Sequence, residues 1–358
     1  MQKNFLKNKL FKIGKFDFKK KKTFIVAEIS SNHNKSYSRA VSLIKKAKKI
    51  GADAIKLQTY TADTITLNSN RKDFSLDHIK GTRWKKYKNF YSIYNHGSTP
   101  WKWHKKLFRL AKKLKIEIFS SPFDETAVTM LENLNCVAYK VASPEINHIP
   151  LLIKIAKTKK PVILSTGLAK IKDIDLAIKT LKENGSNKIF ILKCNSSYPA
   201  PLEESNLINI LYLRKKYNLP IGLSDHSIGN TAAISAVSLG ACIVEKHFNL
   251  GDKKKTLDSF FSLNDKDFEL MVNKIRETEK VLGNYKYSIS KSSIKNLKAK
   301  RSIYVSQNIK KNEKINKSNI KVVRPGLSLH PKYFHKIIGK KVKKNLKVGD
   351  RLKLNYLS

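Results

Sequence analysis

The chain has 358 residues, of which 41% are hydrophobic, and this length favours one large domain plus a smaller one. Its formal net charge is +46, but only nine of the 73 basic residues are arginine and the lysines are spread along the chain, which argues against specific nucleic-acid binding. No apolar run predicts a membrane span, and three cysteines without metal-type spacing favour a reducing, cytoplasmic location.

Residues 1–22 interrupt their apolar pairs with lysine and contain no small-residue cleavage site, so we predict an N-terminal extension that is not a secretory signal. Eight apolar, β-branched runs follow, with helix-like stretches between them, as expected for buried parallel strands in βαβ units. Eight such units in about 230 residues predict a (β/α)8 TIM barrel over residues 23–284. The runs are 23–30, 53–60, 116–123, 137–143, 161–167, 188–194, 220–226 and 242–248.

A doubly wound sheet would share this rhythm, but the first run is followed by SSNHNKS, not by a glycine-rich dinucleotide loop. Polar side chains follow or end the first six strands, and in a barrel they would meet at one mouth. One such residue is usually a satisfied cap, whereas the whole set, with two inward lysines, would be costly to bury without an anionic ligand. The set is Glu28, Lys56, Gln58, Ser120, Ser121, Lys140, Ser143, Ser165, Thr166, Asn195, Ser196 and Tyr198.

Two matching stretches, LSDHSIGN and IVEKHF, end the last two strands with histidines His226 and His247. A lone histidine of this kind is most often a buried structural residue. Because the last two strands of a barrel are neighbours, these two can approach each other and hold a divalent metal that keeps water and substrate as its other ligands. Glu245 points the same way as His247 and could be a metal ligand or a sugar contact.

The basic and hydroxyl side chains predict the other half of the site. They suit a phosphate and a carboxylate, although capping hydroxyls and surface lysines are the alternative interpretation. A small phospho-acid beside a metal suggests phosphoenolpyruvate condensing with a carbonyl compound. The residues are Lys56, Ser121, Lys140, Ser143, Ser165 and Ser224.

The polar segment 285–299 loses the rhythm and predicts a linker, and residues 300–358 predict a small C-terminal domain. This domain contains two similar pieces, VSQNIKKNEKI and VKKNLKVGDRL, each predicted to be a short strand followed by a turn. A module of this size needs support from a partner surface.

The motifs FIVAEISSNH, DAIKLQTY, FSSPFD, AYKVAS, STG, GLSDHS and EKHF occur in an order that resembles the sialic acid synthase family, including its C-terminal antifreeze-like (SAF) domain. KLQTYTADTITL, WKKYKNFYSIYNHGSTPWKWH and DSFFSL are most similar to the pseudaminic acid branch of that family. The resemblance implies condensation of phosphoenolpyruvate with 2,4-diacetamido-2,4,6-trideoxy-altrose. N-acetylneuraminate or legionaminate synthesis is the alternative within the family.

The resemblance also implies roles for single residues. His226 and His247 match metal ligands, for Mn²⁺, Mg²⁺ or Co²⁺, and Glu28 matches the proposed acid/base. Arg324 matches an arginine that one subunit's SAF domain delivers to the other subunit's barrel, which implies a domain-swapped homodimer. Ser196 stands where sialic acid synthases have asparagine. The implied phosphoenolpyruvate contacts are Lys56, Ser121, Lys140, Ser143, Ser165, Ser196 and Ser224, and the implied sugar contacts are Tyr198, Glu245 and Asp258.

Two other classes of protein are alternatives to an enzyme. A nucleic-acid-binding protein would need clustered arginines or aromatic platforms, which the sequence does not have. A non-catalytic carbohydrate- or ice-binding protein could use the C-terminal domain. The intact set of Glu28, Lys56, His226 and His247 favours catalysis over that reading.

Overall fold

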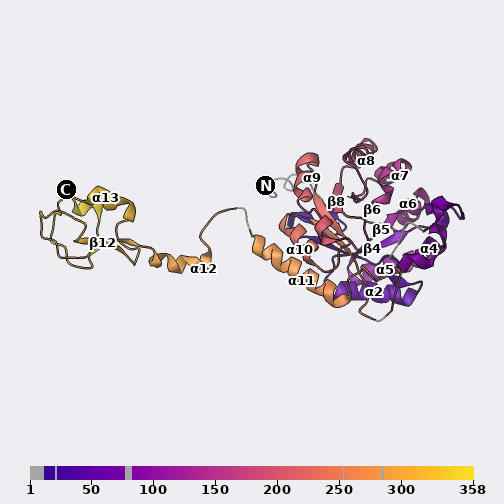
Figure 1. The fold of residues 1–358 in the computed structure, drawn as a ribbon, viewed down its shortest axis with the longest axis horizontal. Helices are drawn as coiled ribbons and strands as arrows, with labels where there is room; N and C mark the ends of the chain where they lie inside the picture. Colours follow the sequence, from indigo (N-terminus) through magenta and orange to yellow (C-terminus); the bar gives the residue numbers. More distant parts are fainter. Residues whose placement is uncertain (1–11, 21, 77–82, 253, 284–285) are drawn as a thin grey trace. The chain divides into compact units, whose positions relative to one another are not determined.

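A computed structural model describes residues 12–20, 22–76, 83–252, 254–283 and 286–358. The chain divides into two compact units, residues 1–284 and 285–358, which we describe separately (Figure 1). No helix among the described residues is long and apolar enough to cross a lipid bilayer.

The first unit is a closed barrel of eight parallel strands, which confirms the predicted TIM barrel. Each strand lies within one of the eight apolar runs, and β10 pairs with β3 to close the ring. The β-branched residues fill the barrel and the layer beneath the helices, where most are fully buried. The strands are β3 (Phe24–Glu28), β4 (Ala54–Thr59), β5 (Glu117–Pro122), β6 (Tyr139–Val141), β7 (Val162–Ser165), β8 (Ile189–Cys194), β9 (Ile221–Asp225) and β10 (Ile243–His247).

Helices surround the barrel and cover its outer face (Figure 1). In the first of them the Ser36 side chain caps the N-terminus by accepting from the backbone N–H of Arg39, and Ala40, Leu43 and Ala47 form the buried stripe at helical spacing. The helices are α2 (Tyr37–Lys49), α5 (Trp101–Leu114), α6 (Glu125–Glu132), α7 (Ile149–Lys157), α8 (Ile171–Glu183), α9 (Asn209–Tyr217), α10 (Thr231–Ser238) and α11 (Asp265–Leu282).

The described part of the N-terminal extension packs against the amino end of the barrel. It forms a small hairpin, β1 (Lys12–Ile13) and β2 (Phe16–Asp17), followed by the turn η1 (Phe18–Lys20). The Phe18 ring lies 5.8 Å from Phe24, at the start of β3, and 4.9 Å from Phe190 in β8. This segment therefore adds aromatic side chains to the barrel core, which its lysine-rich sequence did not suggest.

A long connection between β4 and α5 builds a second apolar cluster. Leu76, Ile93 and Leu257 are buried at its centre, and Trp84 and Tyr94 pack against them. Leu257 belongs to the β10–α11 loop, so this cluster joins two loops that both leave the carboxyl ends of strands. Its short elements are α3 (Ala62–Ile65), η3 (Lys72–Phe74), η4 (Arg83–Lys86) and α4 (Phe90–Gly97), and the other barrel loops contain η2 (Ser30–His33), η5 (Pro144–Asn147) and η6 (Leu202–Glu204).

The second unit has its own small core, in which Ile303, Ile309, Val342 and Leu346 are almost fully buried. It begins with the exposed turns α12 (Lys291–Ile294) and η7 (Lys295–Ala299), which lie in the predicted linker. Its remaining elements are β11 (Ser302–Val305), β12 (Ile320–Val323), η8 (Pro331–Tyr333), α13 (Phe334–Ile337) and η9 (Leu354–Tyr356).

The two similar sequence pieces of this unit pair with each other. Ile309 and Leu346 exchange both backbone hydrogen bonds, at 2.9 and 2.8 Å. The Asn345 side chain accepts from the backbone of Lys311, and the equivalent Asn308 accepts from Val348, so the pieces are related by a local two-fold arrangement. The predicted strands are mostly single bridges, because each backbone turns away soon after its pairing residue.

Candidate active site

Two lysines and two glutamates form a buried network inside the barrel. Lys56 Nζ lies 2.7 Å from Glu28 Oε2 and 3.0 Å from Glu245 Oε1, and Lys140 Nζ lies 3.9 Å from Glu245 Oε1. All four side chains are at most 5% exposed. The strand periodicity explains this arrangement, since these residues take the inward positions of β3, β4, β6 and β10. The structure therefore brings together the inward lysines that the sequence predicted.

The electrostatics of this network suit an anionic ligand. Burial lowers the pKa of Lys56 to about 8, against the opposing effect of Glu245. Burial would raise the pKa of Glu245, but Lys140 and Lys56 hold it below its usual value. Glu245 Oε2 still has no hydrogen-bond partner among the described residues. Glu245 thus neutralises lysines that an incoming phosphate or carboxylate could bind instead.

Four of the predicted serines lie around these lysines, and we call them the arc of serines: Ser121, Ser143, Ser165 and Ser224. Ser121 Oγ is 3.4 Å from Lys56 Nζ, and Ser224 Oγ donates to Glu245 at 3.2 Å. Ser143 Oγ accepts from the backbone N–H of Gly167 at 2.9 Å. Ser165 Oγ is buried and has no hydrogen-bond partner among the described residues, so it is available to a ligand.

Gly167 explains why the STG turn can approach this arc of serines. A Cβ at this position would lie 2.2 Å from Ser196 Oγ and 3.0 Å from both Ser143 Oγ and Cys194 Sγ. The missing side chain therefore lets the β7 turn close over the loops after β6 and β8. Ser196 is half-buried beside Gly167, at the mouth of the barrel where its sequence position predicted it.

Two of the polar strand ends do not join the site. Ser120 points to the outer side of β5, where its hydroxyl is 2.6 Å from Thr59 Oγ1, which in turn lies 2.9 Å from His104 Nε2. Thr166 Oγ1 donates to the backbone carbonyl of Leu192. The expectation that every strand-end residue meets at the mouth is therefore wrong for these two, because strand alternation places Ser120 on the helix side and Thr166 caps the sheet.

The predicted histidine pair comes together. The rings of His226 and His247 are 5.4 Å apart, and both side chains are buried. His226 Nδ1 donates to the backbone carbonyl of Asn195 at 2.8 Å, so in the neutral ring Nε2 carries the lone pair. Burial lowers the pKa of His247 well below its usual value, and its Nδ1 has no hydrogen-bond partner among the described residues.

These features fit a divalent metal. A ligating histidine typically donates its other ring N–H to a carbonyl or carboxylate, as His226 does, and ligates as the neutral imidazole, as His247 would. No group of three or more His, Cys, Asp and Glu side chains suitable for a metal occurs in the part of the chain that the structure describes. A metal held by the two histidines would therefore take its remaining ligands from water and substrate.

Tyr198, one of the predicted sugar contacts, lies against the histidine pair. The Tyr198 ring lies 4.4 Å from His226, and Phe261 lies 4.7 Å from His247. Asp258 is buried and accepts from the backbone N–H of Ser31 at 3.0 Å, and its burial raises the pKa of its carboxyl group. Trp84 packs 5.5 Å from Tyr198, so the second apolar cluster extends to the site.

Arg324 is the one predicted site residue that lies in the second unit. It is exposed and directly follows β12. Its predicted role at a partner's barrel stays a prediction.

Two residues near the site were not identified from the sequence. Glu145 lies two residues beyond Ser143, and burial raises its pKa to about 7 although Lys140 and Lys56 act in the opposite direction. Burial would raise the pKa of Cys194, but His226 at 3.8 Å and its other neighbours bring it down to about 7. The spacing of lysine, serine and glutamate in KVASPE was the signal that could have identified Glu145.

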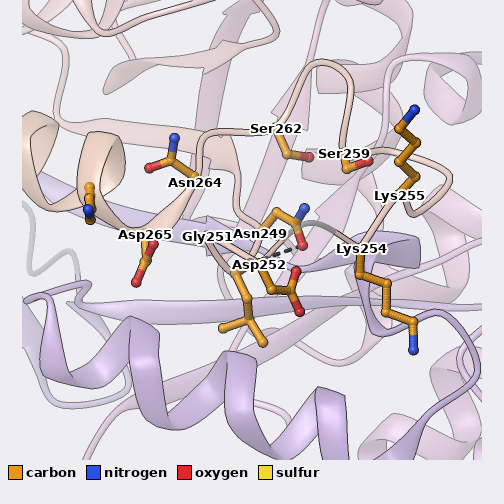
Figure 2. A pocket seen from close by; sticks show the side chains of 11 residues that line it. Asn249, Gly251, Asp252, Lys254, Lys255, Ser259, Ser262, Asn264 and Asp265 are labelled. Carbon is orange, nitrogen blue, oxygen red and sulfur yellow. Dashed lines mark hydrogen bonds between the residues drawn. The ribbon is translucent and has the colours of Figure 1, made fainter.

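A pocket of about 490 Å³ has a lining separate from the site residues described above (Figure 2). Residues that follow β10 and begin α11 line it, with Lys254 and Lys255 on one side and Asn264 and Asp265 on the other (Figure 2). Arg39 holds one wall, since it donates to Asn249 and pairs with Asp252. None of the predicted site residues lines this pocket, so we do not assign the substrates to it.

Fold and site together define a TIM-barrel enzyme that has buried lysines and serines suited to an anion, and a histidine pair, at one mouth. The NeuB family model matches residues 43–287, and the SAF domain model matches residues 300–355. The chain therefore belongs to the NeuB family, the sialic acid synthase family that its motifs predicted.

Individual relatives agree with this assignment. The chain is 44% identical to the pseudaminic acid synthase of Campylobacter jejuni, over 95% of this chain and 98% of that protein. It is 33% identical to the N,N'-diacetyllegionaminic acid synthase of the same species, over 93% and 99%. Among solved structures, a spore coat polysaccharide biosynthesis protein from Bacillus subtilis is 31% identical and matches with a TM-score of 0.65, over 98% and 99% of the two chains.

Proposed function

We propose that this protein condenses phosphoenolpyruvate with 2,4-diacetamido-2,4,6-trideoxy-altrose and water to give pseudaminic acid and phosphate, as a metal-dependent transferase. The observation that carries the proposal is the pair of buried lysines, with its arc of serines, beside the pair of histidines. The greater similarity to a pseudaminic acid synthase than to a legionaminic acid synthase supports the choice of sugar. Because phosphoenolpyruvate is a cytoplasmic metabolite, we place the enzyme there.

The lysines and serines would bind phosphoenolpyruvate. The phosphate and carboxylate oxygens would replace Glu245 as partners of Lys56 and Lys140, and the hydroxyls of Ser143 and Ser165 would donate further hydrogen bonds. These donors are already in place, so little reorganisation is needed when the ligand binds. Orientation of the two substrates at one mouth would supply much of the rate.

The reaction joins C3 of phosphoenolpyruvate to the sugar aldehyde carbon. A metal held by His226 and His247 would supply Lewis acidity at the aldehyde oxygen. Attack by C3 leaves C2 electron-poor, water adds to C2, and the resulting hemiketal phosphate collapses to the new acid and inorganic phosphate. Glu28, which pairs with Lys56 and accepts from the Ser30 backbone at 2.7 Å, would accept a proton from the water or a sugar hydroxyl. Glu145 is a second group that could hold this proton near neutral pH.

The aromatic side chains beside the histidines support a 6-deoxy sugar. Trp84, Tyr198 and Phe261 pack together, with ring distances of 5.0 to 6.2 Å, and present apolar surface to the site. Apolar surface suits the C6 methyl group of the proposed substrate better than the hydroxyl of N-acetylmannosamine. A methyl group alone gives a discrimination of about 10–200-fold, so contacts to the second acetamido group would add to it.

A phosphate-release assay tests this function. The purified enzyme is given phosphoenolpyruvate and a panel of 2-acetamido hexoses, with and without EDTA. We expect 2,4-diacetamido-2,4,6-trideoxy-altrose to give the highest kcat/KM and EDTA to abolish turnover. A higher kcat/KM with N-acetylmannosamine or with the legionaminic precursor would assign the enzyme to another branch, and full turnover in EDTA would rule out the metal.

We also infer a domain-swapped homodimer, in which the SAF domain of one subunit completes the barrel site of the other. Arg324 is exposed in a small basic unit, and its guanidinium offers a fixed fork of donors for a sugar oxygen or an acetamido carbonyl. The family resemblance supports this assembly. Exchange between Lys56→Ala subunits and Arg324→Ala subunits tests this assembly.

A further inference from the structure

A buried ion pair lies directly behind the two histidines. Lys246 Nζ is 2.5 Å from Asp225 Oδ2, and the two side chains are 0% and 3% exposed. Asp225 and Lys246 are opposite each other in the pairing of β9 with β10. Because strand residues alternate between faces, Ser224 and Glu245 point into the barrel, whereas Asp225 and Lys246 point to its helix-covered side.

This pair is tied to the backbone on both sides of His226. Asp225 Oδ1 accepts from the backbone N–H of Ser227 at 2.9 Å and from its hydroxyl at 2.7 Å. Lys246 Nζ also donates to the Ser227 carbonyl at 2.7 Å. The residue before His247 therefore contacts the residues immediately before and after His226.

The strand pairing alone does not set the distance between the histidines. Lys246 and Asp225 form the last pair of the β9–β10 register, so His226 lies one residue beyond it. His247 is held by its pairing with Glu28 of β3 on the other side. The side-chain contacts of Asp225 and Lys246 with Ser227 continue the connection between the two strands past the last paired residues, on both sides of His226.

We propose that Asp225 and Lys246 are a positioning pair that fixes His226 relative to His247 for a shared divalent metal. The proposal rests on the metal site described under the proposed function. A buried ion pair contributes little to stability compared with apolar side chains of the same size, because desolvating both charges opposes their attraction. What it supplies here is one defined geometry, in which Ser227 and Lys246 have specific partners. It also explains why both histidine motifs carry a charged residue just before the histidine.

Mn²⁺ titration of the metal-free protein by calorimetry tests the proposal, and thermal unfolding of each variant is measured beside it. Lys246→Met leaves Asp225 as an uncompensated buried charge, so both stability and Mn²⁺ affinity should fall. Asp225→Leu/Lys246→Met replaces the pair with apolar side chains of similar size and should recover stability. We expect the Mn²⁺ Kd of the double variant to stay about 10- to 100-fold above that of the parent protein. This is the range found when outer-sphere partners of metal ligands are removed.

The matched control is Arg276→Met. Arg276 pairs with Asp53 at 2.5 Å and donates to the Thr23 carbonyl at the amino end of the strands. Its loss should lower stability and leave the Mn²⁺ Kd unchanged. Lys246→Arg keeps the positive charge and should lie closer to the parent protein than Lys246→Met.

The outcomes are distinguishable. If the double variant recovers both stability and the parental Kd, the pair acts on stability alone and the inference is overturned. The inference is also overturned if Arg276→Met raises the Kd as much as Lys246→Met does. If the unaltered protein itself binds no Mn²⁺, the metal site of the proposed function fails, and the positioning role fails with it.

Discussion

The two units of this protein use charge in different ways. The barrel unit, residues 1–284, has 52 basic and 25 acidic residues, whereas the second unit, residues 285–358, has 21 basic and only two acidic residues. Every ion pair found among the described residues lies in the barrel unit, including the buried groups around Glu245 and Asp225. In the second unit, Glu313 and Asp350 accept from the backbone N–H groups of Lys310 and Lys347 and close turns.

In the barrel unit the buried charged side chains have specific partners, whereas in the second unit the charged side chains are numerous but exposed. In the barrel, each buried lysine has carboxylate or carbonyl partners, and removing a partner should have a large effect. In the second unit the lysines are exposed, and surface charges of this kind contribute little. We therefore expect large functional effects from few barrel residues, and from Arg324 alone among the basic residues of the second unit.

The largest effect should follow from removing one histidine. His226→Ala or His247→Ala should abolish phosphate release while circular dichroism shows a folded barrel, because the proposed metal would lose one of its two protein ligands. His335→Ala, at an exposed position of the second unit, is the control and should retain full activity. Turnover by either barrel variant at the parental rate would contradict the assignment of the pair.

Gly167→Ala should give the next largest effect. The new methyl group would approach Ser196 and Ser143, so the STG turn would move away from the arc of serines. We expect kcat/KM for phosphoenolpyruvate to fall about 10- to 100-fold, as for other small displacements of positioning groups. The Mn²⁺ Kd should change little. A parental kcat/KM would show that the turn takes no part in binding phosphoenolpyruvate.

The pKa of Lys56 predicts a loss of substrate binding at high pH. Its folded-state pKa is lowered to about 8, so the ammonium group is lost as the pH rises through that value. We expect KM for phosphoenolpyruvate to rise up to about tenfold per pH unit above it. The unfolded lysine keeps its proton to about 10.5, so this group makes folding more favourable over the same interval, and unfolding should not cause the loss. A flat KM between pH 7.5 and about 9.5 would contradict this role.

Arg324→Ala should weaken sugar use and leave phosphoenolpyruvate and Mn²⁺ binding nearly intact. Loss of one charged donor to a neutral oxygen should lower kcat/KM for the sugar by about 10- to 100-fold. Truncation near residue 290 should act similarly and also destabilise the proposed dimer. Lys321→Ala, an exposed lysine three residues earlier, is the matched control.

Mixing subunits tests the domain swap itself. Inactive Lys56→Ala subunits and weakly active Arg324→Ala subunits are exchanged, and heterodimers are confirmed by mass. With swapped domains, one site of the heterodimer carries both substitutions and the other carries neither, so activity should return. If exchange occurs and activity does not return, Arg324 acts within its own chain or has no role.

The sequence was most informative where a side chain's direction follows from strand periodicity. Lys56, Lys140, Glu245 and His247 were placed correctly because each ends or lies near the end of a predicted strand. Ser120 was misplaced because a neighbouring pair of serines does not itself show which one faces inward. Asp225 and Lys246 were visible beside the histidines, but periodicity gives the face of a residue and not its partner.

Contacts between distant segments were not predictable in this way. Leu76, Ile93 and Leu257 form one cluster although the last is more than 150 residues from the others. The hairpin of residues 12–17 was not predicted, because its lysines favour a solvent-exposed segment. In both places tertiary packing, which local patterns do not report, decides the structure.

The smallest effect should come from the lysines of the second unit. Lys314 and Lys341 pair directly opposite each other, and like charges in such pairs are destabilising. Replacing Lys311, Lys314, Lys341 and Lys343, all exposed, with glutamine should therefore raise the melting temperature slightly.

In the parent protein, raising the salt from about 0.1 to 1 M shortens the Debye length from about 10 to 3 Å and should lower kcat/KM for phosphoenolpyruvate by less than about tenfold. The uncharged sugar provides an internal control, because its kcat/KM should hardly change. We expect the four-lysine variant to keep the same salt dependence, since we propose that the buried lysines of the barrel make the contacts with the substrate. A shallower salt dependence in the variant would instead show that the second unit attracts phosphoenolpyruvate, and that its charge is as functional as the charge of the barrel.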